Sequence, residues 1–96
     1  MGEIPVQISL TGVLRYKAEK DKITASVKPG ESFADLLACI GRQNAGLQLL
    51  EDDRLLDGLL LFYRQGTGGL ERIMDLGNMV TEEKSDLFLT TSMAGG

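Results

Sequence analysis

The chain has 96 residues, with 14 acidic and 10 basic side chains, a net charge of −4, no histidine and one cysteine. The net negative charge disfavours nucleic acid as a partner, because the phosphates would be repelled. It favours a partner protein with a basic surface. The lack of histidine removes the commonest metal ligand and the usual general base, and a single cysteine excludes an internal disulfide and any multi-cysteine zinc site.

The amino-terminal third predicts two strands. Val6, Ile8 and Leu10 alternate with polar residues, which is the period of a half-buried strand, so we expect a strand over residues 4–14. The charged stretch 17–22 is typical of a solvated hairpin tip. Residues 23–27 read as the second strand, which Pro29 and Gly30 end.

One helix is predicted over residues 32–42. Ser32 can cap its first turn, with Asp35 in the position of a capping box. An apolar stripe follows at helical spacing, which indicates packing on a sheet; its members are Phe33, Leu36, Leu37 and Ile40.

The remaining chain predicts further strands. Residues 59–63 form a short apolar run, most simply a buried strand, and residues 86–91 alternate as a last strand. Residues 51–54 and 81–85 read as polar turns, 65–69 as a glycine-rich loop, and 70–75 as a short strand or turn. This order predicts an α+β fold with one helix on one face of the sheet.

The printed sequence closes with Met93, Ala94, Gly95 and Gly96, directly after the last predicted strand. Glycine lacks a Cβ, so such a segment can enter a narrow channel. We expect a domain over residues 1–91, a flexible tail over 92–96, and the Gly96 carboxylate as the working group. The alternative is a small, polar chain end without a function.

Five segments resemble the MoaD/ThiS-type sulfur carriers, which include the small subunit of molybdopterin synthase: residues 6–10, 32–37, 50–56, 86–89 and 93–96. The similarity is most specific in the last segment. It implies a β-grasp, ubiquitin-like fold with a mixed sheet of four to five strands, one main helix across it, and a flexible carboxyl-terminal tail.

The resemblance also implies a function. An E1-like adenylyltransferase would use ATP to activate Gly96, and a sulfurtransferase or cysteine desulfurase would then supply sulfur to give a thiocarboxylate. The tail would donate that sulfur inside the large subunit of a cofactor synthase, for molybdopterin or tungstopterin in preference to thiamine thiazole. The carrier itself would bind no cofactor and no metal, have no catalytic residue, and work in the cytoplasm without nucleic acid or membrane.

A partner surface is expected near the tail. If Leu87 and Leu89 enter the core, the alternation of a strand places Phe88 and Thr90 on the opposite face. Together with Met74 they are the candidate interface residues, against the alternative that the loop 65–69 covers Phe88. Cys39 lies at the flank of the helix stripe and is interpreted as a small buried residue.

Two other functions are compatible with the same residues. The same Gly96 could be joined to target lysines by an isopeptide bond, as in ubiquitin-like protein modifiers. Alternatively, the domain could be a non-covalent interaction module in which the two terminal glycines have no role.

Overall fold

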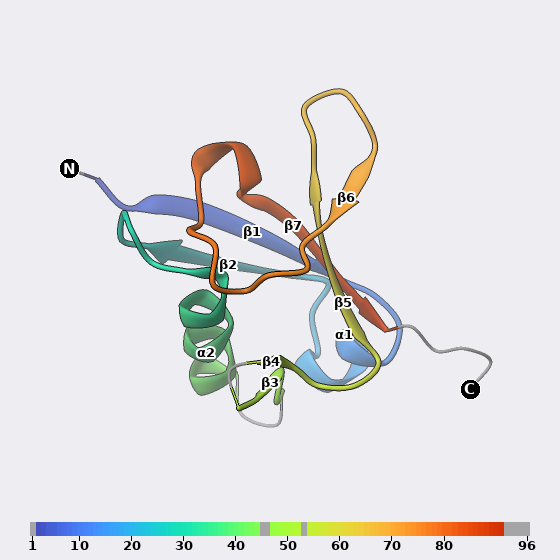
Figure 1. The fold of residues 1–96 in the computed structure, drawn as a ribbon. Coiled ribbons are helices and arrows are strands. Elements are labelled where there is room, and N and C mark those ends of the chain that lie inside the picture. The colour runs from blue at the N-terminus through green and yellow to red at the C-terminus, as the bar shows by residue number, and fades with distance from the viewer. Residues whose placement is uncertain (1, 45–46, 53, 92–96) are drawn as a thin grey trace.

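The computed structural model describes residues 2–44, 47–52 and 54–91. Over these ranges the chain forms two helices, seven strands and one short 3-10 helix, η1 (Figure 1). In chain order these are β1 Ile4–Leu10, α1 Val13–Ala18, β2 Lys22–Val27, α2 Phe33–Gln43, β3 Leu50–Glu51, β4 Arg54–Leu55, β5 Leu59–Arg64, β6 Leu70–Arg72, η1 Glu82–Lys84 and β7 Asp86–Thr91.

Five strands form one mixed sheet in the order β2-β1-β7-β5-β6. β1 and β7 run parallel, whereas the other neighbours are antiparallel. β3 and β4 form a separate two-stranded hairpin in which Leu50 lies opposite Leu55. The α+β expectation and the ubiquitin-like β-grasp architecture, with one main helix on a mixed sheet, are both confirmed.

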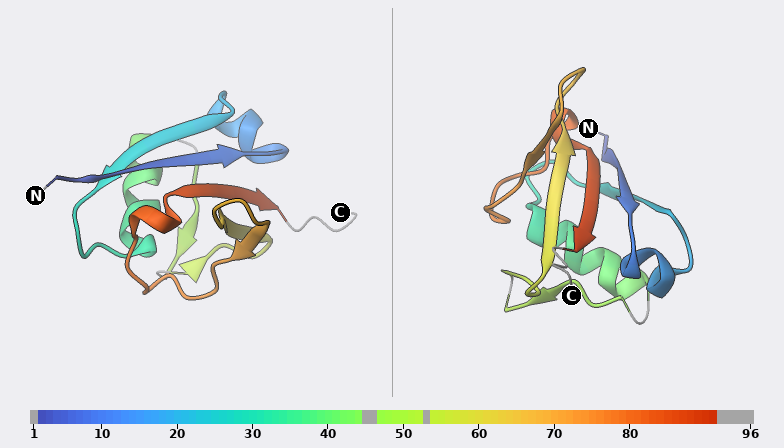
Figure 2. Two further views of the ribbon diagram at one scale, coloured as in Figure 1. Left: turned by 90° about the horizontal axis from the view of Figure 1, so that it is seen from above. Right: turned by 90° about the vertical axis from the view of Figure 1, so that its right-hand side faces the viewer.

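Helix α2 covers one face of this sheet (Figures 1 and 2). Its start is the predicted capping box: the Ser32 hydroxyl accepts from the Asp35 N–H at 3.1 Å, and the Asp35 carboxylate accepts from the Ser32 N–H at 3.0 Å. The apolar stripe of α2 packs on inward-facing residues of the central strands. The most deeply buried side chains at this contact are Phe33, Leu36, Leu37, Ile40, Ile8, Leu61, Leu87 and Leu89.

Helix α1 is where the sequence-based prediction is wrong. The pattern predicts that the first strand continues to residue 14 and that a charged hairpin tip follows over residues 17–22, but β1 ends at Leu10 and α1 begins at Val13. The physical reason lies in two apolar residues one helical turn apart: Leu14 is buried, and Ala18 packs against the same core. The intervening polar residues Arg15 and Tyr16 are exposed and do not prevent a helix.

Strand β5 also differs from expectation. The apolar run 59–63 predicts a buried strand, yet only Leu61 and Tyr63 are buried, while Leu60 and Phe62 are half-buried on the face away from α2. The strand therefore has one face in the core and one apolar face open to solvent. In the described part of the chain, neither helix is both long and apolar enough to cross a membrane.

Candidate functional site: the tail root and the outer sheet face

The predicted site residues Met93, Ala94, Gly95 and Gly96 lie outside the described residues, so the structure is described up to Thr91. The strand that precedes them, β7, lies inside the sheet with β1 on one side and β5 on the other (Figure 2). Its last residue, Thr91, is paired with Leu59 of β5. The root of the tail is thus held by the β5 ladder, while the pairing of β7 with β1 ends at Leu89.

A side-chain hydrogen bond is a second contact that holds the end of β7. The hydroxyl of Thr11 donates to the hydroxyl of Thr90 at 2.7 Å. Thr11 belongs to the turn between β1 and α1, so this bond fixes that turn to the end of β7. Helix α1 consequently lies beside the end of β7 (Figure 1).

Phe88 and Thr90 face away from α2, as the alternation of β7 predicts. Leu87 and Leu89 are completely buried, whereas Phe88 and Thr90 are half-buried. Across the β5–β7 pair, Phe62 lies opposite Phe88 and Leu60 lies opposite Thr90.

Met74 lies on the same face. The Ile73 N–H donates to the Leu61 carbonyl at 2.8 Å, which carries the β5–β6 register one residue beyond β6. Met74 follows and is 76% exposed, and it shares with Leu60 the lining of a depression of about 560 Å³. Continued by one residue, this register sets Met74 opposite Leu60, which itself lies opposite Thr90, so we group the three predicted interface residues with Leu60 and Phe62, which the sequence pattern did not predict. We call this surface the outer patch; it consists of Leu60, Phe62, Met74, Phe88 and Thr90.

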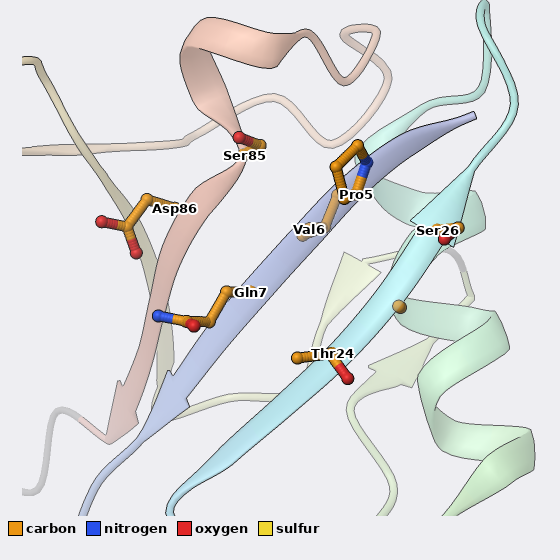
Figure 3. Close-up of a pocket in the computed structure, with 8 residues that line it drawn as sticks. Pro5, Val6, Gln7, Thr24, Ser26, Ser85 and Asp86 are labelled. Carbon is orange, nitrogen blue, oxygen red and sulfur yellow. The ribbon is translucent and has the colours of Figure 1, made fainter. Parts of the chain in front are cut away.

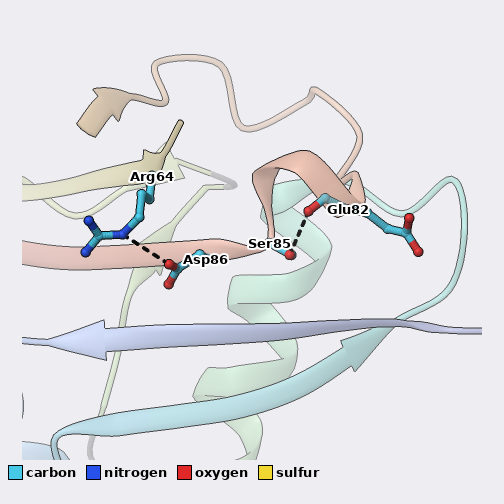
Figure 4. A network of polar contacts seen from close by, with 4 residues as sticks. All are labelled: Arg64, Glu82, Ser85 and Asp86. Atoms are coloured by element: carbon cyan, nitrogen blue, oxygen red, sulfur yellow. Dashed lines mark hydrogen bonds and ion pairs between the residues drawn. The ribbon is translucent and has the colours of Figure 1, made fainter. Parts of the chain in front are cut away.

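Charged groups border the outer patch. The Arg64 guanidinium lies 5.0 Å from the centre of the Phe88 ring, and its Nε donates to Oδ2 of Asp86 at 3.3 Å (Figure 4). The other oxygen of Asp86, Oδ1, is buried and has no hydrogen-bond partner among the described residues. Arg72, opposite Phe62, adds a second exposed cation. The border of the patch thus offers cations to an approaching partner, although the chain as a whole is acidic.

The turn that leads into β7 is closed by its own polar contact. The Ser85 hydroxyl donates to the Glu82 carbonyl at 2.8 Å across η1 (Figure 4). The Gln7 N–H then donates to the Ser85 carbonyl at 2.9 Å, which starts the parallel β1–β7 ladder. These bonds set the register that directs Phe88 outward.

The half of the outer face over β1 and β2 is polar. Figure 3 shows small and polar side chains around a depression of about 550 Å³, among them Gln7, Thr24, Ser26 and Asp86. The outer face therefore divides into an apolar half over β5 and β7 and a polar half over β1 and β2.

Tyr63 is a residue whose side-chain pKa is clearly shifted. Burial, together with the nearby Glu71 carboxylate, raises the pKa of Tyr63 above its ordinary value of 10.0. The Tyr63 hydroxyl donates to Oε1 of Glu71 at 3.3 Å, and Gln65 Nε2 donates to the same oxygen at 2.8 Å. This network ties the loop after β5 to β6; it lies outside the outer patch.

The remaining candidate groups form no site of their own. Cys39 is only half-buried on α2, at the flank of the stripe, and is therefore less buried than the sequence interpretation expected. Within the described ranges, no three carboxylate, thiol or imidazole groups come close enough together to hold a metal ion.

Comparison with known proteins identifies the fold. The sequence matches no protein-family model and no curated protein. Among solved structures, the chain is similar to the HVO 2177 protein of Haloferax volcanii, with a TM-score of 0.76 and 15% identity over 99% of this chain and 89% of that one. It is also similar to SAMP1 of the same organism, with a TM-score of 0.74 and 19% identity over 96% of this chain and 99% of that one.

A third structure, described as H. volcanii small archaeal modifier protein 1, gives a TM-score of 0.72 and 18% identity, covering 94% of this chain and 99% of that one. At these identities the likeness establishes the fold, a ubiquitin-like β-grasp.

Proposed function

We propose that this protein is a sulfur carrier whose chemistry takes place at Gly96. The observation that carries the proposal is the position of β7: a central strand, bonded on both sides, leads directly into the sequence Met93-Ala94-Gly95-Gly96. An extended segment over residues 92–96 would span roughly 17 Å at about 3.3–3.6 Å per residue, which is enough to enter a partner's active site while the domain stays outside.

The chemistry proceeds in three balanced steps. The Gly96 carboxylate attacks the α-phosphate of ATP in an E1-like adenylyltransferase, pyrophosphate leaves, and an acyl-adenylate forms. A persulfide of a sulfurtransferase or cysteine desulfurase attacks the acyl carbon and displaces AMP. A thiol reductant then cleaves the resulting acyl disulfide and leaves a thiocarboxylate on Gly96. The protein is a co-substrate here, and the partner enzymes hold the catalytic groups.

The outer patch is the docking surface in this proposal. Aromatic side chains beside a cation are the residue types that dominate binding energy at protein interfaces. Phe88 lies on the strand that leads into the tail, so a partner that binds Phe88 also positions Gly96. The activating enzyme and the large subunit of a cofactor synthase, acting in the cytoplasm, are the expected occupants, and molybdopterin or tungstopterin is the expected destination of the sulfur.

The deciding experiment is an intact-mass measurement. The protein is incubated with ATP, an E1-like enzyme and a sulfur donor, and the mass of the free chain should rise by the difference between sulfur and oxygen. Gly96→Ala should abolish or strongly slow this rise. Gly69→Ala is the matched control, because Gly69 has no neighbour within 4 Å of an added Cβ and should behave as the parent. Equal rates for the two variants would overturn the proposal.

A second function is favoured by one observation: one of the similar structures is described as H. volcanii small archaeal modifier protein 1. The same acyl-adenylate could be captured by a lysine amine, giving an isopeptide bond between Gly96 and a target. Peptides carrying a Gly-Gly remnant on lysine, recovered after digestion of a native extract and absent with Gly96→Ala, would establish this role.

A further inference from the structure

The two neighbours of β7 support it over different lengths. The pairing with β1 ends where Leu10 lies opposite Leu89. The pairing with β5 continues for two more residues, to Thr91 opposite Leu59. The last two residues of β7, from which the tail leaves the domain, therefore have a backbone neighbour in β5 but none in β1.

The direction of the backbone bonds makes this difference important at Thr91. In an antiparallel pair, residues bonded to the neighbouring strand alternate with residues that point away from it. The Ile73 N–H donates to the Leu61 carbonyl, so Leu61 is turned toward β6 and Leu60 toward β7. Because Leu60 lies opposite Thr90, the backbone of Thr90 is bonded to β5. By the same alternation, the backbone of Thr91 points to the side on which β1 has already ended.

A pair of side chains continues the contact on that side. The Thr11 hydroxyl donates to the Thr90 hydroxyl at 2.7 Å. Continued by one residue, the parallel β1–β7 register sets these two threonines opposite each other. Thr11 is exposed and Thr90 is half-buried, so water could satisfy both hydroxyls if they were apart. The hydrogen bond therefore adds little to stability, and its specific effect is on the position of the end of β7.

Thr11 is itself held on both sides. Before it, the Leu10 N–H donates to the Asp21 carbonyl at 2.7 Å, which attaches the end of β1 to the chain just before β2. After it, Gly12 has a φ of 57°, a conformation that favours glycine, and turns the chain from β1 into α1. The Leu14 N–H donates back to the Thr11 carbonyl at 3.2 Å, and the Leu14 side chain is buried. The Thr11 hydroxyl is therefore presented to β7 from a fixed turn.

The orientation of this strand end matters for a partner that binds the outer patch and also holds the tail. Such a partner has to match two points at once, the patch around Phe88 and the direction in which the chain leaves Thr91. An extended segment over residues 92–96 spans roughly 17 Å, so a rotation of about 10° at its root moves its far end by roughly 3 Å. A misplacement of about 1 Å in an active site can slow a reaction about 100-fold.

We propose that Thr11 is a positioning residue for the tail: its hydroxyl fixes the end of β7 on the side where the β1 ladder has ended, and so sets the direction of the tail relative to the outer patch. This inference rests on the proposed function, because that direction has a task only if Gly96 reacts inside a partner. It adds a residue that belongs to neither the outer patch nor the tail. A root that is already oriented in the free protein lowers the entropic cost of binding.

The first test needs no partner enzyme. Amide hydrogen exchange is compared for the full-length parent, Thr11→Val and Thr24→Val. Valine keeps the shape of threonine and removes the hydroxyl, so in Thr11→Val the Thr90 amide should exchange about two- to tenfold faster, the range that corresponds to one hydrogen bond. The Phe88 amide, two residues earlier on the same ladder, should be unchanged. Thr24→Val is the matched control, because Thr24 is exposed on β2 and makes no side-chain hydrogen bond with a described residue.

The second test is kinetic. For activation by an E1-like enzyme and ATP, Thr11→Val should raise KM about two- to tenfold and leave kcat unchanged, because the enzyme orients the root once the tail is bound. Thr11→Ser keeps the hydroxyl and should restore both KM and the exchange rate of the Thr90 amide. Thr24→Val should behave as the parent. Thr11→Ala removes the same hydroxyl and repeats both measurements should Thr11→Val be poorly folded.

Three results would overturn the inference: equal exchange of the Thr90 amide in Thr11→Val and Thr24→Val, equal KM values for these two variants, or a Thr11→Ser variant that behaves like Thr11→Val. Failure of the proposed function looks different, because the parent itself would then gain no sulfur. Faster exchange of the Thr90 amide in Thr11→Val would in that case still support the attachment of the tail root to Thr11.

Discussion

Phe62 and Phe88 lie directly opposite each other across the β5–β7 pair, and both rings are half-buried on the sheet face away from α2. The Arg64 guanidinium lies over the Phe88 ring, at 5.0 Å from its centre. A cross-strand aromatic pair of this kind stabilises a sheet by only about 0.2–1 kcal/mol. Two aromatic rings on an open face therefore contribute little to folding, and their placement is better suited to binding.

Replacing Phe88 should affect recognition more than stability. For Phe88→Ala we expect the KM for activation of the tail to rise about tenfold, because a central aromatic anchor is lost. The free energy of unfolding, measured with urea, should fall by about 1 kcal/mol, since the ring is only half-buried. Tyr16→Ala is the control: Tyr16 is 83% exposed on α1, and its removal should leave both quantities unchanged. Equal KM values for the two variants would remove the outer patch from the docking surface.

The capping box of α2 should be measurable as a stability increment. Ser32→Ala removes the hydroxyl that accepts from the Asp35 N–H, and it should lower the free energy of unfolding by about 1 kcal/mol. Ser26→Ala is the matched control, because Ser26 is exposed on β2 and makes no side-chain hydrogen bond with a described residue. Coincident urea midpoints for the two variants would show that the cap contributes nothing.

Tyr63 should give the protein an alkaline sensitivity. Burial and Glu71 raise its pKa in the folded state above 10.0, so the neutral hydroxyl is favoured by folding. Below pH 10 this contribution is fully present, and it forms part of the difference in the free energy of unfolding between the parent and Tyr63→Phe. As the pH rises past 10, the unfolded chain ionises first and the difference shrinks until the folded-state pKa is passed.

Thermal melts of the parent and Tyr63→Phe between pH 8 and pH 11 would test this sign. Both proteins contain the same lysines, which titrate in the same range, so the difference between the two melting temperatures isolates the tyrosine. A difference that grows in favour of the parent above pH 10 would contradict the direction of the pKa shift.

The helix α2 and the last strand could be predicted because each has a complete local pattern. Ser32, Asp35 and the apolar stripe fix the start, the face and the length of α2. Leu87 and Leu89 alternate with Phe88 and Thr90, and this alternation predicts which side chains of the strand face the core. In both elements the apolar positions of the sequence are the positions that are buried in the structure. The local pattern was therefore enough to predict the element and its buried face.

Helix α1 and the outer patch could not be predicted, for different reasons. α1 has only Leu14 and Ala18 to signal its buried side, which is too little for a periodic pattern. In β5, the apolar residues Leu60 and Phe62 fill the outward positions, so the alternation that marks a half-exposed strand disappears. A continuous apolar run therefore has two interpretations, a strand buried on both faces or a strand with an open apolar face, and local pattern does not distinguish them.

The parallel contact between β1 and β7 has a kinetic consequence. Gln7 is paired with Asp86, so the two halves of the sheet are joined only when residues nearly the whole described chain apart come together. The neighbouring hairpins, β1 with β2 and β5 with β6, can form from local contacts, but neither can become part of one sheet until β7 inserts between β1 and β5. Folding should therefore be limited by a single long-range closure, with rates in the slower range of mixed α/β domains of this size, and the last segment to be locked in place is the one that carries the tail.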